Sequence, residues 1–416
     1  MTKPEIVTFG CRLNAFESEV IRGHAEAAGL DDAIIINTCA VTSEAERQAR
    51  QTIRKLHREN PESRIIVTGC AAQVNGDAFA GMDEVDIVLG NKEKLSAESY
   101  LNLPAEGGVL VSDIMQASET SGHLIKGFDS RTRAFVQIQQ GCDHRCTFCI
   151  IPFGRGNSRS VPMGFLANQM SELVDAGYNE FVLTGVDISS YGGDLPGQPS
   201  LGELCRRLLN SVSGLERLRL SSLDPAVVDE DLIRLIEEDE RLMPHLHLSV
   251  QAGSNMILKR MKRRHDRRDV IELCDRLRTA RGDLVFGADI ITGFPTETEE
   301  MFSDTLELVG EAGLTYLHVF PYSPRPGTPA AKMPQMTDQV RRERAKRLRE
   351  RGEQAKSVYF DTLIGSTARM LSEADNRGYT DHYAPVQLET PITPGSVLPV
   401  KITGRTGAGL TAELVA

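Results

Sequence analysis

Three cysteines stand within eight residues in the stretch QGCDHRCTFC, which ends at Cys149. With Cys142 and Cys146 they form the pattern C-x3-C-x2-C, and the next cysteine along the chain is Cys205. A structural zinc site needs four thiolate or imidazole ligands. Three thiolates can instead hold three irons of a 4Fe-4S cube and leave the fourth iron open. The alternatives are a zinc site completed by His144 and three thiols without a metal.

A second set of cysteines, Cys11, Cys39 and Cys70, is spread over the start of the chain, and each ends an apolar stretch typical of a strand. These stretches are residues 4–11, 32–39 and 63–70. In an open parallel sheet the carboxyl ends of the strands line one crevice, where ligands bind. We therefore expect the three thiols to converge in space. The alternative is three separate buried thiols, since free cysteine packs as a small hydrophobe.

The elements that must position this second set alternate between strands and helices. Helical patterns at residues 14–29 and 43–60 separate the apolar stretches, and a fourth stretch follows at residues 85–94. This order predicts a parallel sheet covered by helices. Asn14 stands where the first helix begins, and we expect its side chain to cap that helix.

A longer alternation begins near residue 131 and positions the cysteine triplet. Its predicted strands are residues 133–142, 180–187, 215–225, 244–254, 284–295 and 316–324, with helical patterns at 166–177, 231–240, 267–281 and 299–313. Six βα units predict a partial parallel barrel, in which chemistry sits at the C-terminal strand ends. The triplet follows the first strand and opens onto that face. Cys205 and Cys274 lie in helical patterns, and we expect them to pack in the core.

The remaining segments predict a connector, a helix and a small β-barrel. Residues 95–130 are rich in small and polar residues and carry at most one short strand, and residues 338–365 form a charged helix. Short strand patterns follow at 366–373, 383–389, 396–406 and 409–416. The fold class is therefore α/β: an open parallel sheet, a partial (β/α)6 barrel and a small C-terminal β-barrel.

Composition and charge exclude several classes of protein. The chain has 416 residues, of which 40% are hydrophobic and 25% charged, as in ordinary globular proteins of two or three domains. We find no signal-peptide pattern and no apolar run of membrane-spanning length, so we expect a cytoplasmic protein without a membrane partner. In that reducing setting clustered thiols indicate metal rather than disulfides. A net charge of −11 argues against non-specific coating of nucleic acid but permits local basic patches.

The triplet, with Phe148 before its last cysteine, resembles that of the radical S-adenosylmethionine (SAM) enzymes. With the upstream cysteines, the chain resembles one family of these enzymes, the methylthiotransferases. The resemblance rests on TFGCRLNAFESE, INTCAVTSEA, VTGCAAQ, GCDHRCTFCIIPFGRGNSRS, LTGVDISSYG, HLSVQAGSN, ADIITGFPTETEE and FPYSPRPGTPAA. It implies a methylthiotransferase N-terminal domain at residues 1–120, a radical SAM domain at 128–355 and a TRAM-like RNA-binding domain at 356–416.

The same resemblance implies two 4Fe-4S clusters, each held by three cysteines and each with one exchangeable position. The cysteines are Cys142, Cys146 and Cys149 for the cluster that binds SAM, and Cys11, Cys39 and Cys70 for an auxiliary cluster that carries sulfur. SAM then serves as methyl donor and as source of a 5′-deoxyadenosyl radical. Such a radical can open an unactivated C–H bond, on which acid–base catalysis has no hold.

Four further residues are candidates for contact with SAM. Asp187, Ser222 and Gln251 lie at predicted strand ends on the active face, where their side chains could hydrogen-bond the cofactor. Phe148 lies within the cysteine triplet. Turn and cap roles are the alternatives for the three polar residues.

Basic residues near the barrel rim are candidates for RNA contact. Arg155 and Arg159 follow the cluster loop, and residues 259–268 hold seven Lys or Arg. In an otherwise acidic protein, phosphate contact is at least as good an interpretation of these groups as simple solvation. Residues 341–351 alternate Arg with Glu, which predicts a solvated linking helix with RNA contact as its alternative role.

The leading functional hypothesis is C2 methylthiolation of N6-threonylcarbamoyladenosine at position 37 of tRNA. The stretch LTGVDISSYGGDL, from Leu183 to Leu195, and the opening TFGCRLNAFES resemble that branch of the family. The isopentenyladenosine branch usually has Gln-Asn where this chain has Val186 and Asp187. The threonylcarbamoyl carboxylate could pair with a basic rim that includes Arg155, Arg159 or the run at residues 259–268.

Three alternatives stay open at this point. They are methylthiolation of isopentenyladenosine in tRNA, methylthiolation of an aspartate in a ribosomal protein, and a non-catalytic iron–sulfur or zinc RNA-binding module. The partners implied are tRNA and an electron donor such as flavodoxin or ferredoxin. The sequence does not identify the sulfur donor.

Overall fold

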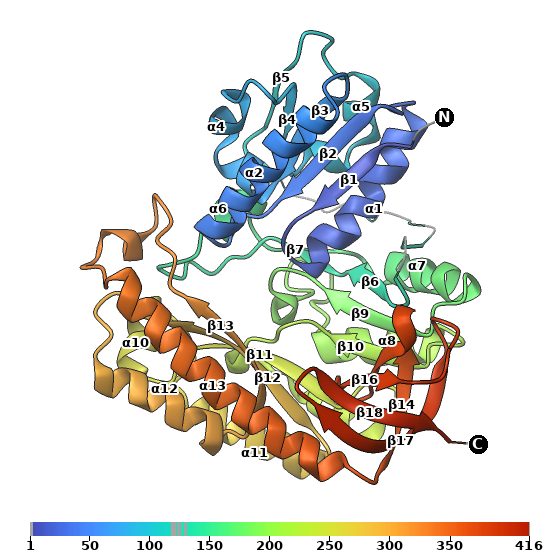
Figure 1. The fold of residues 1–416 in the computed structure, drawn as a ribbon, viewed down its shortest axis with the longest axis vertical. Helices are drawn as coiled ribbons and strands as arrows, with labels where there is room; N and C mark the ends of the chain where they lie inside the picture. Colours follow the sequence, from blue (N-terminus) through green and yellow to red (C-terminus); the bar gives the residue numbers. More distant parts are fainter. Residues whose placement is uncertain (1–2, 118–121, 123–124, 126, 129–130, 416) are drawn as a thin grey trace.

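The computed structural model describes residues 3–117, 122, 125, 127–128 and 131–415. Its first unit is a five-stranded parallel sheet in the order β1-β2-β3-β4-β5 (Figure 1). The strands are β1 (Glu5–Thr8), β2 (Ala33–Thr38), β3 (Arg64–Gly69), β4 (Ile87–Leu89) and β5 (Gly108–Leu110). The helices are α1 (Arg12–Ala27), α2 (Ser43–Glu59), α3 (Cys70–Val74), α4 (Gly76–Ala80) and α5 (Ala97–Leu101).

The central strands of this sheet are apolar on both faces because side chains of other elements cover both. All six residues of β2 are buried. Ile34 and Ile36 pack in one core cluster with Ile53 of α2, whereas Ile35 packs in another with Ile21 of α1. The predicted parallel sheet is confirmed. The short strand predicted in the connector is β5, and it completes the sheet beside β4.

The second unit is the predicted partial barrel of six parallel strands. These are β6 (Ala134–Gln137), β9 (Glu180–Thr184), β10 (Arg217–Leu220), β11 (His245–Gln251), β12 (Val285–Thr292) and β13 (Leu314–Pro321). They form two three-stranded halves, β10-β9-β6 and β11-β12-β13, which the parallel bridge between Leu223 and Leu248 links. Cys205 and Cys274 are fully buried in the barrel core, as predicted.

Helices cover the outside of this barrel, and a short hairpin stands at its first strand. These helices are α7 (Met163–Asp175), α8 (Leu201–Ser211), α9 (Glu230–Glu238), α10 (Asn255–Met261), α11 (Arg267–Ala280) and α12 (Glu299–Glu311). Helix α6 (Ile151–Arg155) instead packs against α3 of the N-terminal unit. The hairpin pairs β7 (Gln139–Gln140) with β8 (Arg159–Ser160). The loop between these two strands carries the cysteine triplet.

A long helix, α13 (Asp338–Leu363), packs against β13 and leads into a closed five-stranded barrel at the C-terminal end (Figure 1). Its strands are β14 (Thr367–Ser372), β15 (Arg377–Thr380), β16 (Pro385–Leu388), β17 (Val397–Thr406) and β18 (Gly409–Leu414). The predicted β-barrel is confirmed, but the sequence interpretation missed β15. Its four residues, RGYT, contain a glycine and too little apolar alternation to indicate a strand.

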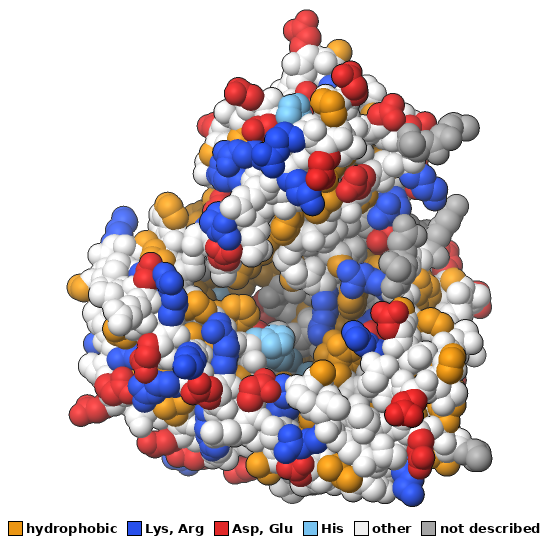
Figure 2. Space-filling view, in the orientation of Figure 1, with side chains coloured by type: hydrophobic (Ala, Val, Ile, Leu, Met, Phe, Trp, Pro, Cys, Tyr) orange, Lys and Arg blue, Asp and Glu red, His pale blue; other side chains and the backbone are white. Residues whose placement is uncertain are grey.

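The three units meet around a hollow (Figure 2). The N-terminal sheet contacts the barrel through α3 against α6 and α1 against β6. The C-terminal barrel contacts the partial barrel through Arg217 and Asp381. In the part of the chain that the structure describes, no helix has the length and apolar character needed to cross a membrane.

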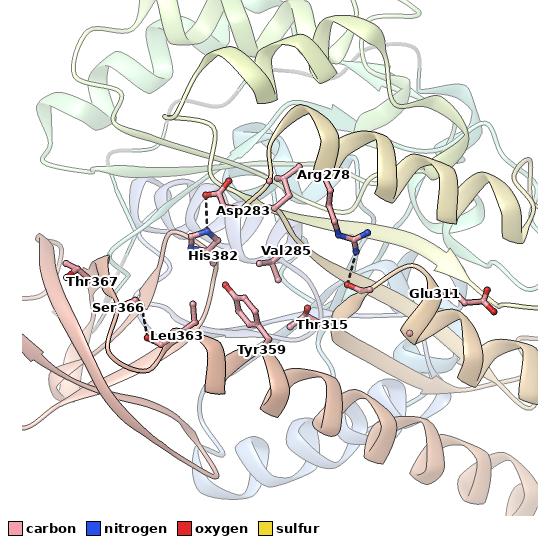
Figure 3. Close-up of a pocket in the computed structure, with 14 residues that line it drawn as sticks. Arg278, Asp283, Val285, Glu311, Thr315, Tyr359, Leu363, Ser366, Thr367 and His382 are labelled. Carbon is pink, nitrogen blue, oxygen red and sulfur yellow. Dashed lines mark hydrogen bonds and ion pairs between the residues drawn. The ribbon is translucent and has the colours of Figure 1, made fainter.

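A groove of about 660 Å³ lies between the partial barrel and the C-terminal unit (Figure 3). Val285 at the start of β12 and Tyr359 of α13 line it, and His382 contacts Asp283 at 3.1 Å across the junction. The groove therefore lies at the N-terminal ends of the barrel strands, away from the cysteine triplet at the other end.

Candidate functional site: two cysteine trios and the contact between them

The loop that carries Cys142, Cys146 and Cys149 is fixed at its start by a close approach of backbone. Gly141 has φ +75°, and a Cβ there would lie 1.9 Å from the carbonyl oxygen of Asn157, so only glycine fits. The amide of Cys142 then donates to the carbonyl of Gly156 at 3.0 Å.

The other side of this loop is tied to the barrel. The Thr147 amide donates to the carbonyl of Met261 at 3.1 Å, and the Ala330 amide donates to the carbonyl of Thr147 at 2.9 Å. Phe148 packs edge-on against Phe294, with ring centroids 6.5 Å apart. Backbone bonds and packing therefore position the loop that carries the three thiols.

The second trio converges at one edge of the N-terminal sheet, as the strand order predicts. Cys11 precedes α1, Cys39 follows β2 and Cys70 is the first residue of α3. Cys39 and Cys70 are buried, whereas Cys11 is exposed. Burial raises the pKa of Cys39 to about 12, with contributions in the same direction from the nearby Cys70 and Cys11. Cys39 therefore lies near both other thiols of the trio.

Both trios have the chemistry that an iron–sulfur cluster requires. Burial raises the pKa of Cys142 to about 12 and that of Cys149 to about 11, so iron must displace protons from these thiols. A guanidinium accompanies each trio and offsets the negative charge of bound thiolates. Arg263 Nη1 lies 3.7 Å from Cys146 Sγ, and Arg155 Nε lies 3.1 Å from Cys70 Sγ. The donor set fits a 4Fe-4S cluster at each trio.

Arg155 connects the two trios physically. It ends α6, directly after the cysteine loop, yet its side chain is 2% exposed and reaches into the N-terminal unit. Besides Cys70 Sγ, it donates to Glu17 Oε1 at 2.7 Å, to Gln140 Oε1 at 2.6 Å and to Asn14 Oδ1 at 2.5 Å. Every one of these partners is buried.

Glu17 is the carboxylate that pairs with both cations of this buried network, Arg155 and Lys94. Its Oε2 accepts hydrogen bonds from Lys94 Nζ at 2.7 Å and from Arg155 Nη2 at 3.0 Å. Burial by itself would raise the pKa of Glu17, but Arg155 and Lys94 lower it to about 2. The same carboxylate and Cys70 hold the pKa of Arg155 well above its ordinary value despite burial. Burial lowers the pKa of Lys94, and Glu17 partly offsets this shift.

The structure corrects two predictions at this junction. Asn14 does not cap α1: its amide donates to the carbonyls of Phe9 and Thr38, because it lies inside α1 where the sheet edge is buried. Arg155 and Arg159 do not form a basic rim for RNA. Arg159 is 5% exposed and donates to the carbonyls of Arg155 and Asn157, since buried backbone oxygens need donors.

Five arginines of the basic run at residues 259–268 form hydrogen bonds or ion pairs within the protein. Arg260 donates to the Thr296 carbonyl, Arg263 to that of Ser249, and Arg267 to that of Gly253. Arg264 and Arg268 pair with Asp224 and Glu272. Arg260, Arg263 and Arg267 therefore tie loops to the barrel. The other four basic residues of the run are exposed, and phosphate contact by them stays a prediction; they are Lys259, Lys262, Arg264 and Arg268.

The linking helix α13 is solvated on one side only, which corrects the prediction for residues 341–351. Arg344 is 5% exposed and lies 2.7 Å from Glu297, and Arg349 donates to the Val319 carbonyl. The charged pattern therefore includes the face that packs on the barrel.

Three of the four predicted SAM-contact residues lie at or just after the C-terminal ends of strands: Asp187 after β9, Ser222 after β10 and Gln251 at the end of β11. The fourth, Phe148, lies in the cysteine loop. Asp187 Oδ2 lies 3.1 Å from His144 Nε2, so the histidine adjoins Asp187 as well as the cysteines. Ser222 Oγ lies 3.3 Å from Asp289 Oδ2. Gln251 has φ 72°, a left-handed conformation that costs energy in a residue with a Cβ and is found at functional sites.

The sequence interpretation missed a group of metal-ligand type inside the barrel. His247 Nε2 and His318 Nδ1 lie 3.0 Å and 3.3 Å from Asp289 Oδ1. Their ligand atoms all lie within 4.8 Å, so they could also hold a divalent ion. The alternation in HLHLSVQ was the available signal, because it turns His245 and His247 to the same face of β11. The partners come from two other strands.

Solved structures share this fold. The radical S-adenosylmethionine methyltransferase TsrM from Kitasatospora setae aligns with a TM-score of 0.56 over 80% of this chain and 75% of that one, at 14% identity. Residues 136–309 match the radical SAM superfamily, and residues 3–90 match the uncharacterized protein family UPF0004. The first match covers the partial barrel from β6 to α12 and ends before β13, and the second spans the three upstream cysteines.

Curated relatives extend over nearly the whole chain. The threonylcarbamoyladenosine tRNA methylthiotransferase MtaB of Rickettsia prowazekii is 52% identical over 402 residues, 97% of this chain and 95% of that protein. The MtaB of Bacillus subtilis is 36% identical over 95% of this chain and 92% of that protein. The tRNA-2-methylthio-N(6)-dimethylallyladenosine synthase of Rickettsia rickettsii is 32% identical over 99% of both. The chain therefore belongs to the radical SAM methylthiotransferases, in the branch of the threonylcarbamoyladenosine tRNA methylthiotransferases MtaB.

Proposed function

We propose that this protein adds a methylthio group to C2 of N6-threonylcarbamoyladenosine at position 37 of tRNA. The observation that carries the proposal is the 52% identity to a threonylcarbamoyladenosine tRNA methylthiotransferase over 97% of the chain. The presence of two separate cysteine trios supports it, because sulfur insertion and radical formation are two tasks that need two centres.

Cys142, Cys146 and Cys149 hold the 4Fe-4S cluster that binds SAM, and Cys11, Cys39 and Cys70 hold an auxiliary 4Fe-4S cluster. Bound cluster and SAM supply the one-electron chemistry that opens an unactivated C–H bond, and SAM also supplies the methyl group. SAM is contacted at the strand ends by Asp187, Ser222 and Gln251, and in the cysteine loop by Phe148. The chain's own part is placement: the loop bonds at Gly141 and Thr147 fix the first trio, and Arg155 fixes its position relative to Cys70.

The three units form three domains with different roles, at residues 1–120, 128–355 and 356–416. The last boundary falls within α13, which is continuous from Asp338 to Leu363. The closed C-terminal barrel binds the tRNA as a TRAM-like module. The remaining partners are an electron donor such as flavodoxin or ferredoxin and a sulfur donor. The activity belongs to the cytoplasm, where tRNA is modified.

The test is mass spectrometry of tRNA nucleosides from a strain that lacks the gene. We expect 2-methylthio-N6-threonylcarbamoyladenosine to disappear and its unthiolated precursor to accumulate, with return of the product when the gene is restored. A gene with all six cluster cysteines replaced is the control and should not restore it. Loss of a methylthiolated isopentenyl-type nucleoside, or of methylthiolation on a ribosomal protein, would contradict the proposal.

A further inference from the structure

One side chain of the C-terminal barrel, Tyr383, contacts both other units of the chain. Its hydroxyl accepts hydrogen bonds from Arg12 Nη2 of the N-terminal unit and from Arg133 Nη1 of the partial barrel, each at 3.2 Å. Its ring stacks on His245, with centroids 5.1 Å apart and planes 16° apart, and Arg219 lies 5.0 Å from the ring centroid. Histidine side chains also lie in the hollow between the units, with Lys and Arg side chains at its edge (Figure 2).

The backbone holds Tyr383 in this place at a cost. Its φ is 65°, a left-handed conformation that is rare for an aromatic residue and costs of order 1–3 kcal/mol. The turn persists because Arg219 donates to the carbonyls of Thr380 and Asp381 at 2.8 Å and 2.9 Å. Strain that surrounding contacts maintain in this way is found where a side chain has a specific task.

The arginines around Tyr383 differ in their carboxylate partners. Arg133 lies 3.0 Å from Glu180 and 2.9 Å from Glu373, and Arg219 lies 2.9 Å from Glu180. Among the residues that the structure describes, Arg12 has no carboxylate within ion-pair distance, and its recorded contacts are the hydroxyl and ring of Tyr383. A guanidinium whose partner is a phenol rather than a carboxylate keeps most of its donors available for an anion.

The neighbouring histidine does not compete for that anion. Burial lowers the pKa of His245 well below its ordinary value, and His247 and Arg219 lower it further, so this imidazole is neutral. Its Nε2 is buried without a hydrogen-bond partner among the described residues. Of the three arginines beside Tyr383, Arg12 is therefore the one without a carboxylate partner among the described residues. The neutral ring of His245 is a polar wall next to Tyr383.

We propose that Arg12, oriented by Tyr383, binds the carboxylate of the threonylcarbamoyl group and selects the substrate by it. This rests on the proposed function. Arg12 directly follows Cys11, the exposed member of the auxiliary trio, to which C2 of the adenine must come. In adenine, C2 and the carbon that bears N6 flank the same ring nitrogen, so a base placed with C2 at the trio brings its N6 substituent alongside. A planar guanidinium binds a carboxylate through two parallel hydrogen bonds.

A phosphate of the tRNA backbone offers the same anionic chemistry, and the experiment separates the two sources. The substrates are two anticodon stem-loop RNAs, one with N6-threonylcarbamoyladenosine and one in which its carboxylate is a carboxamide. The reconstituted full-length enzyme is compared with Arg12→Gln, Arg12→Lys and Tyr383→Phe, and with Arg54→Gln as an exposed arginine control on α2. Dissociation constants and kcat/KM are measured for each pair, with circular dichroism as the check on folding.

We expect the wild type and Arg54→Gln to prefer the carboxylate RNA by about tenfold to a hundredfold, the range for hydrogen bonds to a charged group. Arg12→Gln should bind both RNAs equally, Arg12→Lys should keep part of the preference, and Tyr383→Phe should reduce it while its ring still stacks. Equal weakening toward both RNAs in Arg12→Gln, with the preference intact, would overturn the inference in favour of phosphate contact. A wild-type enzyme that fails to methylthiolate either RNA would instead overturn the proposed function.

Discussion

Arg155 Nε lies 3.1 Å from Cys70 Sγ, so a residue of the loop that follows one cysteine trio donates to a sulfur of the other. The same side chain is bonded to Glu17 and Asn14 of α1. A hydrogen bond to a cluster sulfur and the surrounding burial are known determinants of cluster potential. Arg155 therefore sets both the position of the N-terminal unit on the barrel and the environment of Cys70.

Replacement of Arg155 should separate these two roles. Arg155→Leu leaves Glu17 buried with one cation fewer, and breaking a buried ion pair costs about 3–5 kcal/mol. Arg155→Lys keeps the charge but loses the planar fork. We expect Arg155→Leu to have a lower free energy of unfolding than Arg155→Lys, as measured by denaturation. Both variants should shift the reduction potential of the auxiliary cluster, as measured by redox titration. An unchanged potential in both variants would limit Arg155 to a structural role.

The metal content should follow the cysteine trios. Two 4Fe-4S clusters correspond to about eight irons per chain after anaerobic reconstitution. Replacing Cys142, Cys146 and Cys149 with alanine should leave about half of that iron and abolish reductive cleavage of SAM. Cys205→Ala and Cys274→Ala are matched controls, because both thiols are buried in the barrel core, and they should keep the full iron content. A purified protein with one zinc and no iron would refute the assignment.

The auxiliary trio should be needed for sulfur insertion but not for radical formation. With Cys11, Cys39 and Cys70 replaced by alanine, the triplet on the barrel loop is untouched, since its loop bonds go to the barrel at Met261 and Ala330. We expect 5′-deoxyadenosine to form at a measurable rate while no methylthiolated nucleoside appears in liquid chromatography with mass spectrometry. Methylthiolated product from this variant would show that the trio has another role.

Acid should destabilise the junction through Glu17. Its folded-state pKa is depressed to about 2, below the ordinary value of 4.5, so ionised Glu17 stabilises the fold above pH 4.5. That contribution, on the order of 3 kcal/mol, is lost as the pH falls from about 4.5 toward 2. Glu17→Gln should be less stable at neutral pH and should lose less stability on acidification. Denaturant unfolding of the metal-free wild type and variant at a series of pH values measures both slopes, and parallel slopes would contradict this account.

Much of the fold was predictable because its determinants are local. The apolar runs AIIINT and RIIVTG indicate central strands, and the structure confirms them as β2 and β3. The cysteines after those strands converge because parallel strands share a carboxyl edge. Strand β15 was missed because four residues around Gly378 carry no period, and it is the barrel closure that makes them a strand.

The basic residues show where sequence reasoning stops. The sequence around Arg155 and Arg159 predicted a solvent-exposed basic rim, but both side chains are buried in the structure. A charge pattern records how many cations a segment has, but the partner that neutralises each cation comes from elsewhere in the chain. Glu17 is 138 positions from Arg155, and nothing near either residue in the sequence indicates the other.

The sequence by itself determined the chemistry of the protein: two sets of three thiols, the strands that end in them and the family to which they belong. Only the tertiary structure decided how these parts are oriented to one another. Arg12 and Tyr383 are 371 positions apart and meet because three separately folded units close around one hollow. Ligand identity follows from residue type and short spacing, whereas long-range pairing follows from how buried charges and apolar faces are satisfied once the units pack.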